Sequence, residues 1–289
     1  MSTRQSALVT GASRGGLGDA LAQELHARGF RVFATARTLP KVQHLKDLGM
    51  EVVKMDVADS TSIRNAAAQV ASLTGNRLDI LINNAGTGYQ STLLDADMET
   101  ARQLFNVNVF GVLDVTQAFG PLLIASKGII VNAGSVLGRV PMPFCGVYNA
   151  SKAALDSLSK QMRIELAPFD IRVIHVNAGG IQSDFLSHAA GEKGLPEKSP
   201  YYAGHRVLNP WISGEITRRK YQPRLARRQD YAKSVVDAIV KRNPPSCLWT
   251  GYSAWVIWFT TSFLWRDATD LMMWAMGAPD IKVAISSNE

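Results

Sequence analysis

The chain is poor in cysteine and in histidine clusters. Its 289 residues include two cysteines, Cys145 and Cys247, and five histidines, and neither residue type occurs at metal-ligand spacing. A disulfide framework and a zinc-type site are therefore not expected. We predict two buried thiols and no metal.

Charge is also scarce. Charged side chains make up 19% of the chain, below the usual share of about 25%, while 46% of the residues are hydrophobic. This composition favours a large core over disorder. The net charge of +7 is spread along the chain except near residues 218–228. No nucleic-acid-binding motif accompanies that cluster, so we expect no nucleic-acid partner. The first residues, "MSTRQSALVTG", lack the apolar core of a secretory signal, which predicts an intracellular protein.

What the chain does have is a regular alternation of short apolar strands and amphipathic helices. We expect strands at residues 6–10, 31–36, 51–57, 78–85, 128–135 and 171–177. We expect helices at residues 18–29, 60–73, 97–123, 147–168 and 230–241. Strands without polar alternation are buried on both faces and need helical crossovers. The pattern therefore predicts an α/β fold, a doubly wound parallel sheet, with ligands beyond the carboxyl ends of its strands.

A glycine-rich turn, "VTGASRGGLGDAL" (9–21), follows the first strand and opens the first helix. Glycines let the backbone approach a pyrophosphate, and the helix N-terminus supplies N–H donors. In this context the turn predicts a Rossmann-type dinucleotide site in one domain that spans residues 1–289. The second strand ends without an acid, and Arg37 stands where an acid would hold the ribose of NAD. Together with Arg14 in the turn, it favours the 2′-phosphate of NADPH/NADP+.

Tyr148 and Lys152 lie four residues apart in the stretch "VYNASKAALDSL" (147–158), and residues at this spacing share one helix face. A lysine ammonium beside a phenol favours the phenolate and lowers the phenol pKa. Tyr148 can then act as a general acid that protonates a carbonyl oxygen as hydride reaches the carbon. We expect Ser135, at the end of the fifth strand, to hydrogen-bond the same oxygen.

Two later segments break the alternation. Residues 181–229 are rich in Gly, Pro and basic residues. We interpret them as a substrate lid whose aromatic side chains Phe185, Tyr201, Tyr202 and Trp211 line a lipophilic pocket. The basic side of this lid suits a substrate phosphate or an anionic membrane, with a solvated surface as the alternative.

The second segment is the apolar tail, residues 247–279, in which Cys247 to Trp265 carry no charge and four tryptophans. Three interpretations stay open for it. The tail spans a membrane, or it lies at a membrane or lipid-droplet interface, or it packs against the body or a partner subunit, with its start as a last strand.

Several motifs in order resemble the short-chain dehydrogenase/reductase family over about residues 5–180. "TGASRGGLG" (10–18) is similar to its TGxxxGxG turn, with one extra residue: Leu17 stands where the family has glycine, and Gly18 follows it. "DV" (56–57) and "NNAG" (83–86) resemble two further motifs. "NVNVFG" contains Asn108, "YNASK" resembles YxxxK, and "NAGGIQS" (177–183) stands for PGxxxT with Ala178 replacing proline and Ser183 replacing threonine.

This resemblance implies a catalytic set of Ser135, Tyr148, Lys152 and Asn108. It implies that Lys152 holds the nicotinamide ribose and that Asn108 anchors a proton-carrying water. The implied cofactor contacts are Gly11, Ser13, Arg14, Gly15, Gly16, Leu17, Gly18, Arg37, Asp56, Val57, Asn84, Ala85, Gly86, Tyr148, Lys152, Gly179, Ile181 and Ser183.

Within the family, the expanded turn, "FATAR", "LPEKSPYY" (195–202) and the tryptophan-rich tail are most similar to fungal-type 1-acyldihydroxyacetone-phosphate reductases and natural-product ketoreductases. The expectation is an NADPH-dependent reductase of a lipophilic ketone. Its candidate substrate is acyl-dihydroxyacetone phosphate, with a polyketide-type or hydroxysteroid-like substrate as alternative. A homo-oligomer, cytoplasmic or attached to the endoplasmic reticulum or lipid droplets, would follow. The alternative of another class is a non-catalytic protein that binds NADPH and a lipid surface.

Overall fold

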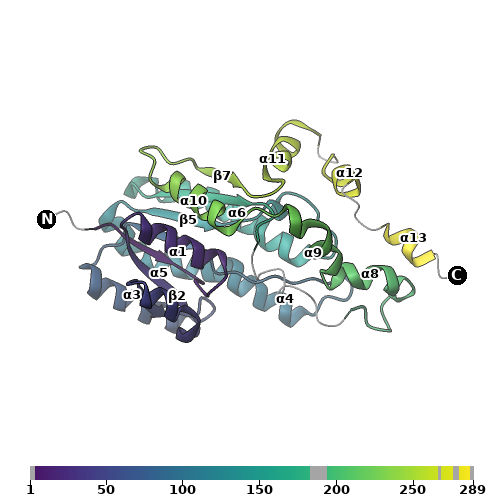
Figure 1. Cartoon of the computed structure of the whole chain (residues 1–289), viewed down its shortest axis with the longest axis horizontal. Helices are drawn as coiled ribbons and strands as arrows, with labels where there is room; N and C mark the ends of the chain where they lie inside the picture. The colour runs from purple at the N-terminus through teal and green to yellow at the C-terminus, as the bar shows by residue number, and fades with distance from the viewer. Residues whose placement is uncertain (1–3, 183–193, 266–267, 276–279, 287–289) are drawn as a thin grey trace.

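Seven parallel strands form one sheet in the order β3-β2-β1-β4-β5-β6-β7 (Figure 1). The computed structural model describes residues 4–182, 194–265, 268–275 and 280–286. The strands are β1 (Ser6–Val9), β2 (Arg31–Ala36), β3 (Glu51–Lys54), β4 (Ile80–Asn83), β5 (Ile129–Ala133), β6 (Arg172–Ala178) and β7 (Cys247–Thr250). The order reverses direction between β1 and β4, and this switch point is where a doubly wound fold binds its ligand. The predicted fold class is confirmed.

The strands are apolar because helices cover both faces of the sheet. One layer contains α1 (Leu17–Ala27) and α10 (Arg228–Ile239), whose Leu21, Leu25 and Val236 are fully buried against the sheet. The other layer contains α3 (Ser60–Thr74), α5 (Gly111–Ser126) and α6 (Gly146–Glu165), with Phe119 and Leu155 in the core. The short α2 (Gln43–Asp47) lies between β2 and β3 in the chain. Each layer thus buries one apolar stripe of its helices.

Helix ends depart from the prediction in small ways. The helix expected at 60–73 is capped by Asp59, whose carboxylate accepts a hydrogen bond from the Thr61 N–H at 2.8 Å, and it ends at Thr74. The expected helix at 97–123 is continuous through α4 (Met98–Phe105), a π-helical turn (Asn106–Phe110) and α5. This stretch, Met98–Ser126, is long and apolar enough to cross a membrane. Its Val115 and Phe119 are fully buried in the core beneath the sheet, as in a core helix.

The part of the predicted lid that the structure describes contains helices that the sequence analysis did not predict. It contains α8 (His205–Ile212) and α9 (Glu215–Tyr221). Leu208 and Ile212 of α8 pack against Phe144, which lies just before α6, and against Ala284. Tyr201, Tyr202 and Trp211 are partly buried in this same cluster. Phe185 lies outside the described residues. The role of these aromatic side chains in a substrate pocket stays a prediction.

The tail begins as the edge strand β7, which pairs with β6 in parallel. It continues as α11 (Ala254–Phe263), α12 (Ala268–Ala275) and α13 (Ile281–Ser286), which extend along one end of the body (Figure 1). At 1.5 Å per residue, the ten residues of α11 span about 15 Å. A membrane core is about 30 Å thick, so the spanning interpretation is wrong for this helix.

Candidate active site

Ser135 and Tyr148 meet at the carboxyl end of the sheet. Ser135 follows β5 and caps the 3-10 turn Val136–Gly138, and its Oγ accepts a hydrogen bond from the Leu137 N–H at 3.1 Å. Tyr148 lies in the first turn of α6 and is hydrogen-bonded to Ser135. The Lys152 Nζ lies 5.7 Å from the centre of the Tyr148 ring. The structure therefore brings these three predicted residues together.

Burial dominates the acid–base properties of this pair. It raises the pKa of Tyr148 well above its ordinary value, and the hydrogen bond to Ser135 opposes the rise. Burial also lowers the pKa of Lys152 to about 8, although its Nζ donates to the Ala133 carbonyl at 2.8 Å. Burial thus outweighs the lowering of the Tyr148 pKa that Lys152 was predicted to cause, and the expected net lowering is wrong. At neutral pH the phenol carries its proton, which a general acid needs.

Asn108 lies in the π-helical turn and has no exposed surface. Its Oδ1 accepts from the Thr87 N–H at 2.9 Å, while its Nδ2 donates to the Thr87 carbonyl and to Ser151 Oγ. Ser151 precedes Lys152 on α6, so the side chain of Asn108 joins the loop after β4 to α6. With its side chain so engaged, an Asn108 contact to water would fall on its main-chain carbonyl. π-helical turns of this kind occur frequently at functional sites.

The glycine turn adopts the conformation that its sequence requires. Gly11 and Gly15 have φ of 67° and 82°, a region that favours glycine. Gly18, the residue displaced by the expanded turn, lies in the first helical turn. A Cβ at this position would lie 2.5 Å from both the Asn84 Nδ2 and the Gly11 carbonyl oxygen. Gly18 therefore permits the close approach of α1 to the ends of β1 and β4, although it falls one position later than in the family pattern.

The strand end at Asn84 and Ala85 closes over this turn. Thr10 Oγ1 accepts from both the Asn84 and Ala85 N–H groups at 2.9 and 2.8 Å. Asn84 Nδ2 in turn donates to the carbonyls of Thr10 and Gly11. Gly86 follows, and a Cβ there would lie 3.3 Å from Asn108 Oδ1 and 3.7 Å from Lys152 Nζ. These contacts place the predicted "NNAG" segment between the glycine turn and the side chains of Asn108 and Lys152.

Arg14 and Arg37 lie at the edge of the glycine turn and are exposed. The Arg14 N–H donates to the Lys41 carbonyl at 3.0 Å, so the turn is held against the segment after β2 that begins with Arg37. Within the described residues, neither guanidinium is in an ion pair. Asp56 and Val57, after β3, are half-buried, and Asp56 Oδ1 accepts from the Ala58 N–H. Two such arginines offer charge-assisted donors to a phosphate.

The last predicted cofactor segment is described in part. Gly179 follows β6, and a Cβ there would lie 2.2 Å from the Tyr252 carbonyl oxygen. Ile181 is buried in the core layer of α1 and α10. Ser183 lies outside the described residues.

The sequence interpretation missed three residues that brace the glycine turn. The Asp19 carboxylate accepts from the Gly15 N–H at 2.8 Å and pairs with His44 Nε2 at 2.8 Å. Burial acts to raise the pKa of Asp19, but the hydrogen bonds from His44, Gly15 and Gln23 leave it below its ordinary value. Arg228, which the sequence placed in the basic side of the lid, donates to the Gly15 carbonyl at 2.9 Å. These partners are 4 to 213 residues apart in the sequence. Only Asp19, an acid in the first turn of α1, has a local sequence signal that could have predicted its role.

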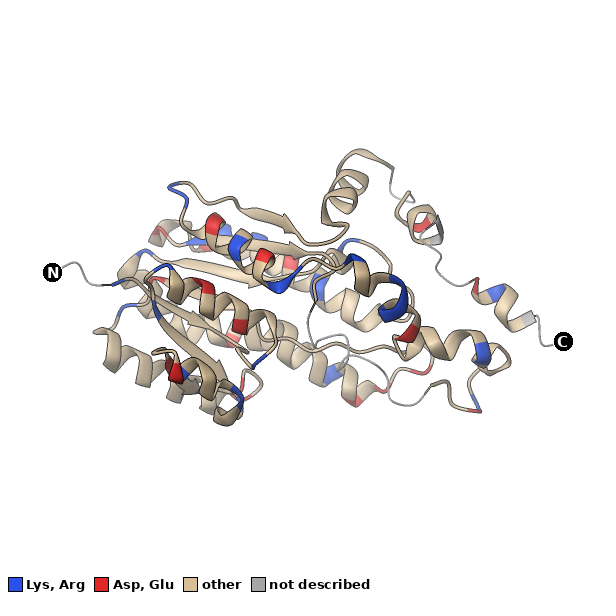
Figure 2. Ribbon diagram, in the orientation of Figure 1, with Lys and Arg blue, Asp and Glu red and all other residues tan. Residues whose placement is uncertain are grey.

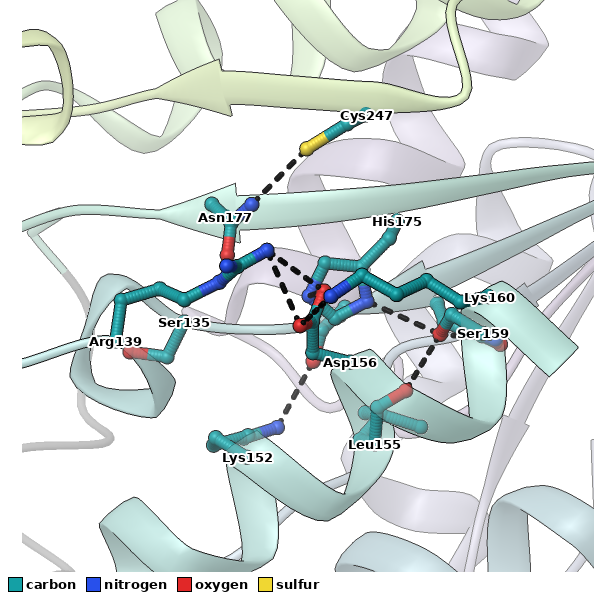
Figure 3. Close-up of polar contacts among 12 residues, drawn as sticks. Ser135, Arg139, Lys152, Leu155, Asp156, Ser159, Lys160, His175, Asn177 and Cys247 are labelled. Atoms are coloured by element: carbon teal, nitrogen blue, oxygen red, sulfur yellow. Dashed lines mark hydrogen bonds and ion pairs between the residues drawn. The ribbon is translucent and has the colours of Figure 1, made fainter. Parts of the chain in front are cut away.

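A buried polar cluster lies behind the Ser135 turn (Figure 3). Asp156 on α6 contacts Arg139, Lys160 and His175, with N–O distances of 3.1, 2.7 and 3.7 Å. Ser159 Oγ donates to the Leu155 carbonyl, so it accepts from His175 Nδ1 at 3.0 Å. Burial lowers the pKa of His175 to about 4, which leaves this residue neutral. His175 is therefore a buried core residue, 2% exposed.

The predicted thiols are both free, and they differ in exposure. Cys145 is buried, whereas Cys247 is half-buried on the edge strand β7. Cys247 Sγ accepts from Asn177 Nδ2 at 3.1 Å. Among the described residues, no group of His, Cys, Asp and Glu could hold a metal.

Comparison with known proteins identifies the family. The short chain dehydrogenase family matches residues 5–194, so the chain belongs to the short-chain dehydrogenase/reductase family of oxidoreductases. A short-chain dehydrogenase, fogD, of Aspergillus ruber is 38% identical over 96% of this chain and 94% of its own length. The NADPH-dependent 1-acyldihydroxyacetone phosphate reductase of Schizosaccharomyces pombe is 35% identical over 87% of both chains.

Solved structures agree with this assignment. A short-chain dehydrogenase from Streptomyces avermitilis is similar with a TM-score of 0.77 at 28% identity, over 96% of this chain and 97% of its own. A short chain dehydrogenase from Burkholderia cenocepacia in complex with NADP has a TM-score of 0.71 at 28% identity, over 93% and 97%. The glycine cradle at Gly11 and Gly18 and the two arginines of this chain fit such a cofactor.

Proposed function

We propose that this protein is an NADPH-dependent reductase of a ketone in a lipophilic substrate. One observation carries the proposal: a buried Tyr148 is hydrogen-bonded to Ser135 and has Lys152 Nζ 5.7 Å from the centre of its ring. The bound cofactor would supply hydride to the carbonyl carbon. Arg14 and Arg37 would hold a 2′-phosphate, and the N–H groups of the glycine turn would hold the pyrophosphate.

The chain's own residues would then supply and replace the proton that the substrate oxygen takes up. Ser135 Oγ would hydrogen-bond the substrate oxygen and hold it against Tyr148. Tyr148 would donate its proton to that oxygen as negative charge develops there, which in general contributes about 10²–10⁴-fold. Lys152, fixed on the Ala133 carbonyl, would stabilise the phenolate that remains and hold the nicotinamide ribose. The main-chain carbonyl of Asn108 would hold a water that returns a proton to Lys152.

For the substrate, the geometry supports a phosphate-bearing ketone, as in the name of the Schizosaccharomyces pombe relative. Gln90 Oε1 and Arg218 Nη1 both lie within 3.4 Å of the point where a Gly214 Cβ would stand. Gln90 Nε2 in turn donates to Cys145 Sγ, three residues before Tyr148. Arg218 is thus a basic lid residue near Gln90, which contacts the residue just before α6, and its guanidinium suits a phosphate.

The test compares palmitoyl-dihydroxyacetone phosphate with neutral cyclic and aryl ketones in an NADPH oxidation assay. We expect turnover of the phosphate lipid, with KM raised about tenfold or more in Arg218→Ala because one charge-assisted contact is lost. The control Arg206→Ala, which removes an exposed arginine of α8 in the same lid, should leave KM unchanged. Turnover of neutral ketones alone would contradict the phosphate-bearing substrate and favour a natural-product ketone instead. NADPH binding without any turnover would support the non-catalytic alternative.

A further inference from the structure

Helix α11 has an exposed aromatic face. Among its residues and the two that follow it, Trp255, Val256, Phe259, Phe263, Leu264 and Trp265 expose between 44% and 68% of their surface. Three of these rings form a continuous row, because Trp255 and Phe259 have centroids 6.0 Å apart and Phe259 and Phe263 have centroids 5.4 Å apart. A row of this size on one face is an interaction surface rather than scattered exposed residues.

The opposite face of α11 is fixed to the active site. Ala254 and Ile257 are buried with Val136 and Val140, which belong to the segment that begins at Ser135. The helix therefore lies on the turn that carries the catalytic serine. The exposed face of α11 is therefore the solvent side of a helix whose other side packs against the Ser135 turn.

Basic side chains border the start of this helix. Arg224 Nη1 donates to the hydroxyl of Tyr252, two residues before α11. The Tyr252 ring lies 6.5 Å from Tyr221, over whose ring the Lys220 ammonium lies at 5.6 Å. With Arg219, these cations are exposed. Figure 2 shows blue on α9 and neither colour on α11. One acid, Glu215, opens α9.

We infer that the α11 face and the basic edge beside it, Arg219, Lys220 and Arg224, together form a docking surface for an anionic phospholipid membrane. Tryptophan and phenylalanine rings suit the boundary between headgroups and acyl chains, and basic residues at their border attract lipid phosphates. Docking of a second copy through this face would bring two clusters of like charge together. The helix is too short to span, so it lies in the interface.

This docking has a consequence for catalysis, and that part alone rests on the proposed reductase function. The helix that would enter the headgroup layer also packs against the Ser135 turn. A lipophilic ketone dissolved in the membrane would then reach the active site without crossing water.

The test measures binding of the full chain with NADPH to vesicles in a flotation assay, without any ketone. Phosphatidylcholine vesicles are compared with vesicles that also contain phosphatidic acid. The variants are Trp255→Ser with Phe259→Ser, and Arg219→Glu with Lys220→Glu. The control is Leu48→Ser, an equally exposed apolar residue beside β3 at the opposite edge of the sheet. NADPH binding verifies that each variant is folded.

We expect the wild type to bind anionic vesicles and to release from them at high salt. Each double variant should lower the partition coefficient about tenfold or more, and Leu48→Ser should leave it unchanged. Absence of wild-type binding would overturn the inference, as would binding that survives both double variants. A dimer that dissociates in the Trp255 and Phe259 variant, without vesicle binding by the wild type, would assign the face to a second copy instead. Because no turnover is measured, these outcomes do not depend on the reductase proposal.

Discussion

Arg139 and Asp156 form a partly buried ion pair that joins the Ser135 turn to the catalytic helix. Arg139 lies four residues after Ser135 and Asp156 lies four residues after Lys152, so the two segments run side by side. Arg139 Nη2 lies 3.1 Å from both Asp156 oxygens (Figure 3). Between the two ends, a Cβ on Gly138 would lie 2.9 Å from the Lys152 carbonyl carbon. The pair therefore helps to position Ser135 against Tyr148.

Arg139→Gln should lower kcat about tenfold, because a small displacement of Ser135 costs much of its orientation effect. The dissociation constant of NADPH should stay within about twofold, since the glycine turn is far from this pair. Lys160→Gln is the matched control: it also removes a cation from Asp156, but one that holds no part of the Ser135 turn. Equal losses of kcat in the two variants would show that activity depends on neutralising the Asp156 charge and not on Arg139 positioning the Ser135 turn.

Gly18→Ala should weaken NADPH binding and lower the melting temperature. The new methyl group would meet Asn84 Nδ2 and the Gly11 carbonyl at 2.5 Å, and neither group can move without opening the turn. Gly120→Ala in α5 is the control, since nothing lies within 4 Å of its Cβ. That control should gain about 0.5–1 kcal/mol from helix propensity. A Gly18→Ala protein with unchanged melting and NADPH affinity would mean that α1 does not approach the strand ends this closely.

Arg37→Asp should move cofactor preference from NADPH toward NADH. The change replaces a cation suited to the 2′-phosphate by the acid that NAD sites use for the ribose. We expect the ratio of kcat/KM for the two cofactors to fall about a hundredfold or more. Arg64→Asp on α3, also an exposed arginine, serves as control for net charge. A ratio that changes equally in both variants would contradict a specific role for Arg37.

Lys152 should make stability depend on pH in a defined direction. Its pKa is about 8 in the fold and 10.5 as the ordinary value, so between these values the unfolded chain holds a proton that the folded chain has lost. Stability therefore rises with pH across this window. The melting temperature of the wild type, relative to Lys152→Met, should increase from about pH 7 to about pH 9.5. If the difference in melting temperature between wild type and Lys152→Met does not change with pH, the pKa of Lys152 is not lowered in the folded protein.

Local sequence patterns predicted the strands, the glycine turn and the proximity of Ser135, Tyr148 and Lys152 because their signals are short. The strand "ILIN" is buried at every position and apolar at its first three, and Tyr148 and Lys152 are one helical turn apart. The sequence could not reveal the pairing of Arg228 with Gly15 or of Arg139 with Asp156, since these contacts are made by tertiary folding. The sequence also overestimated the effect of Lys152 on the Tyr148 pKa, because the burial of both side chains is a product of tertiary folding.

The most direct test of the central claim is single-turnover oxidation of bound NADPH by a ketone substrate in wild type and Tyr148→Phe. Phenylalanine keeps the ring and removes the hydroxyl that is hydrogen-bonded to Ser135. Loss of a general acid predicts a rate lower by about 10²–10⁴-fold, whereas the NADPH dissociation constant should rise only a few-fold at most, because Tyr148 is one of many implied cofactor contacts. A Tyr148→Phe rate within a few-fold of the wild type would show that another group supplies the proton.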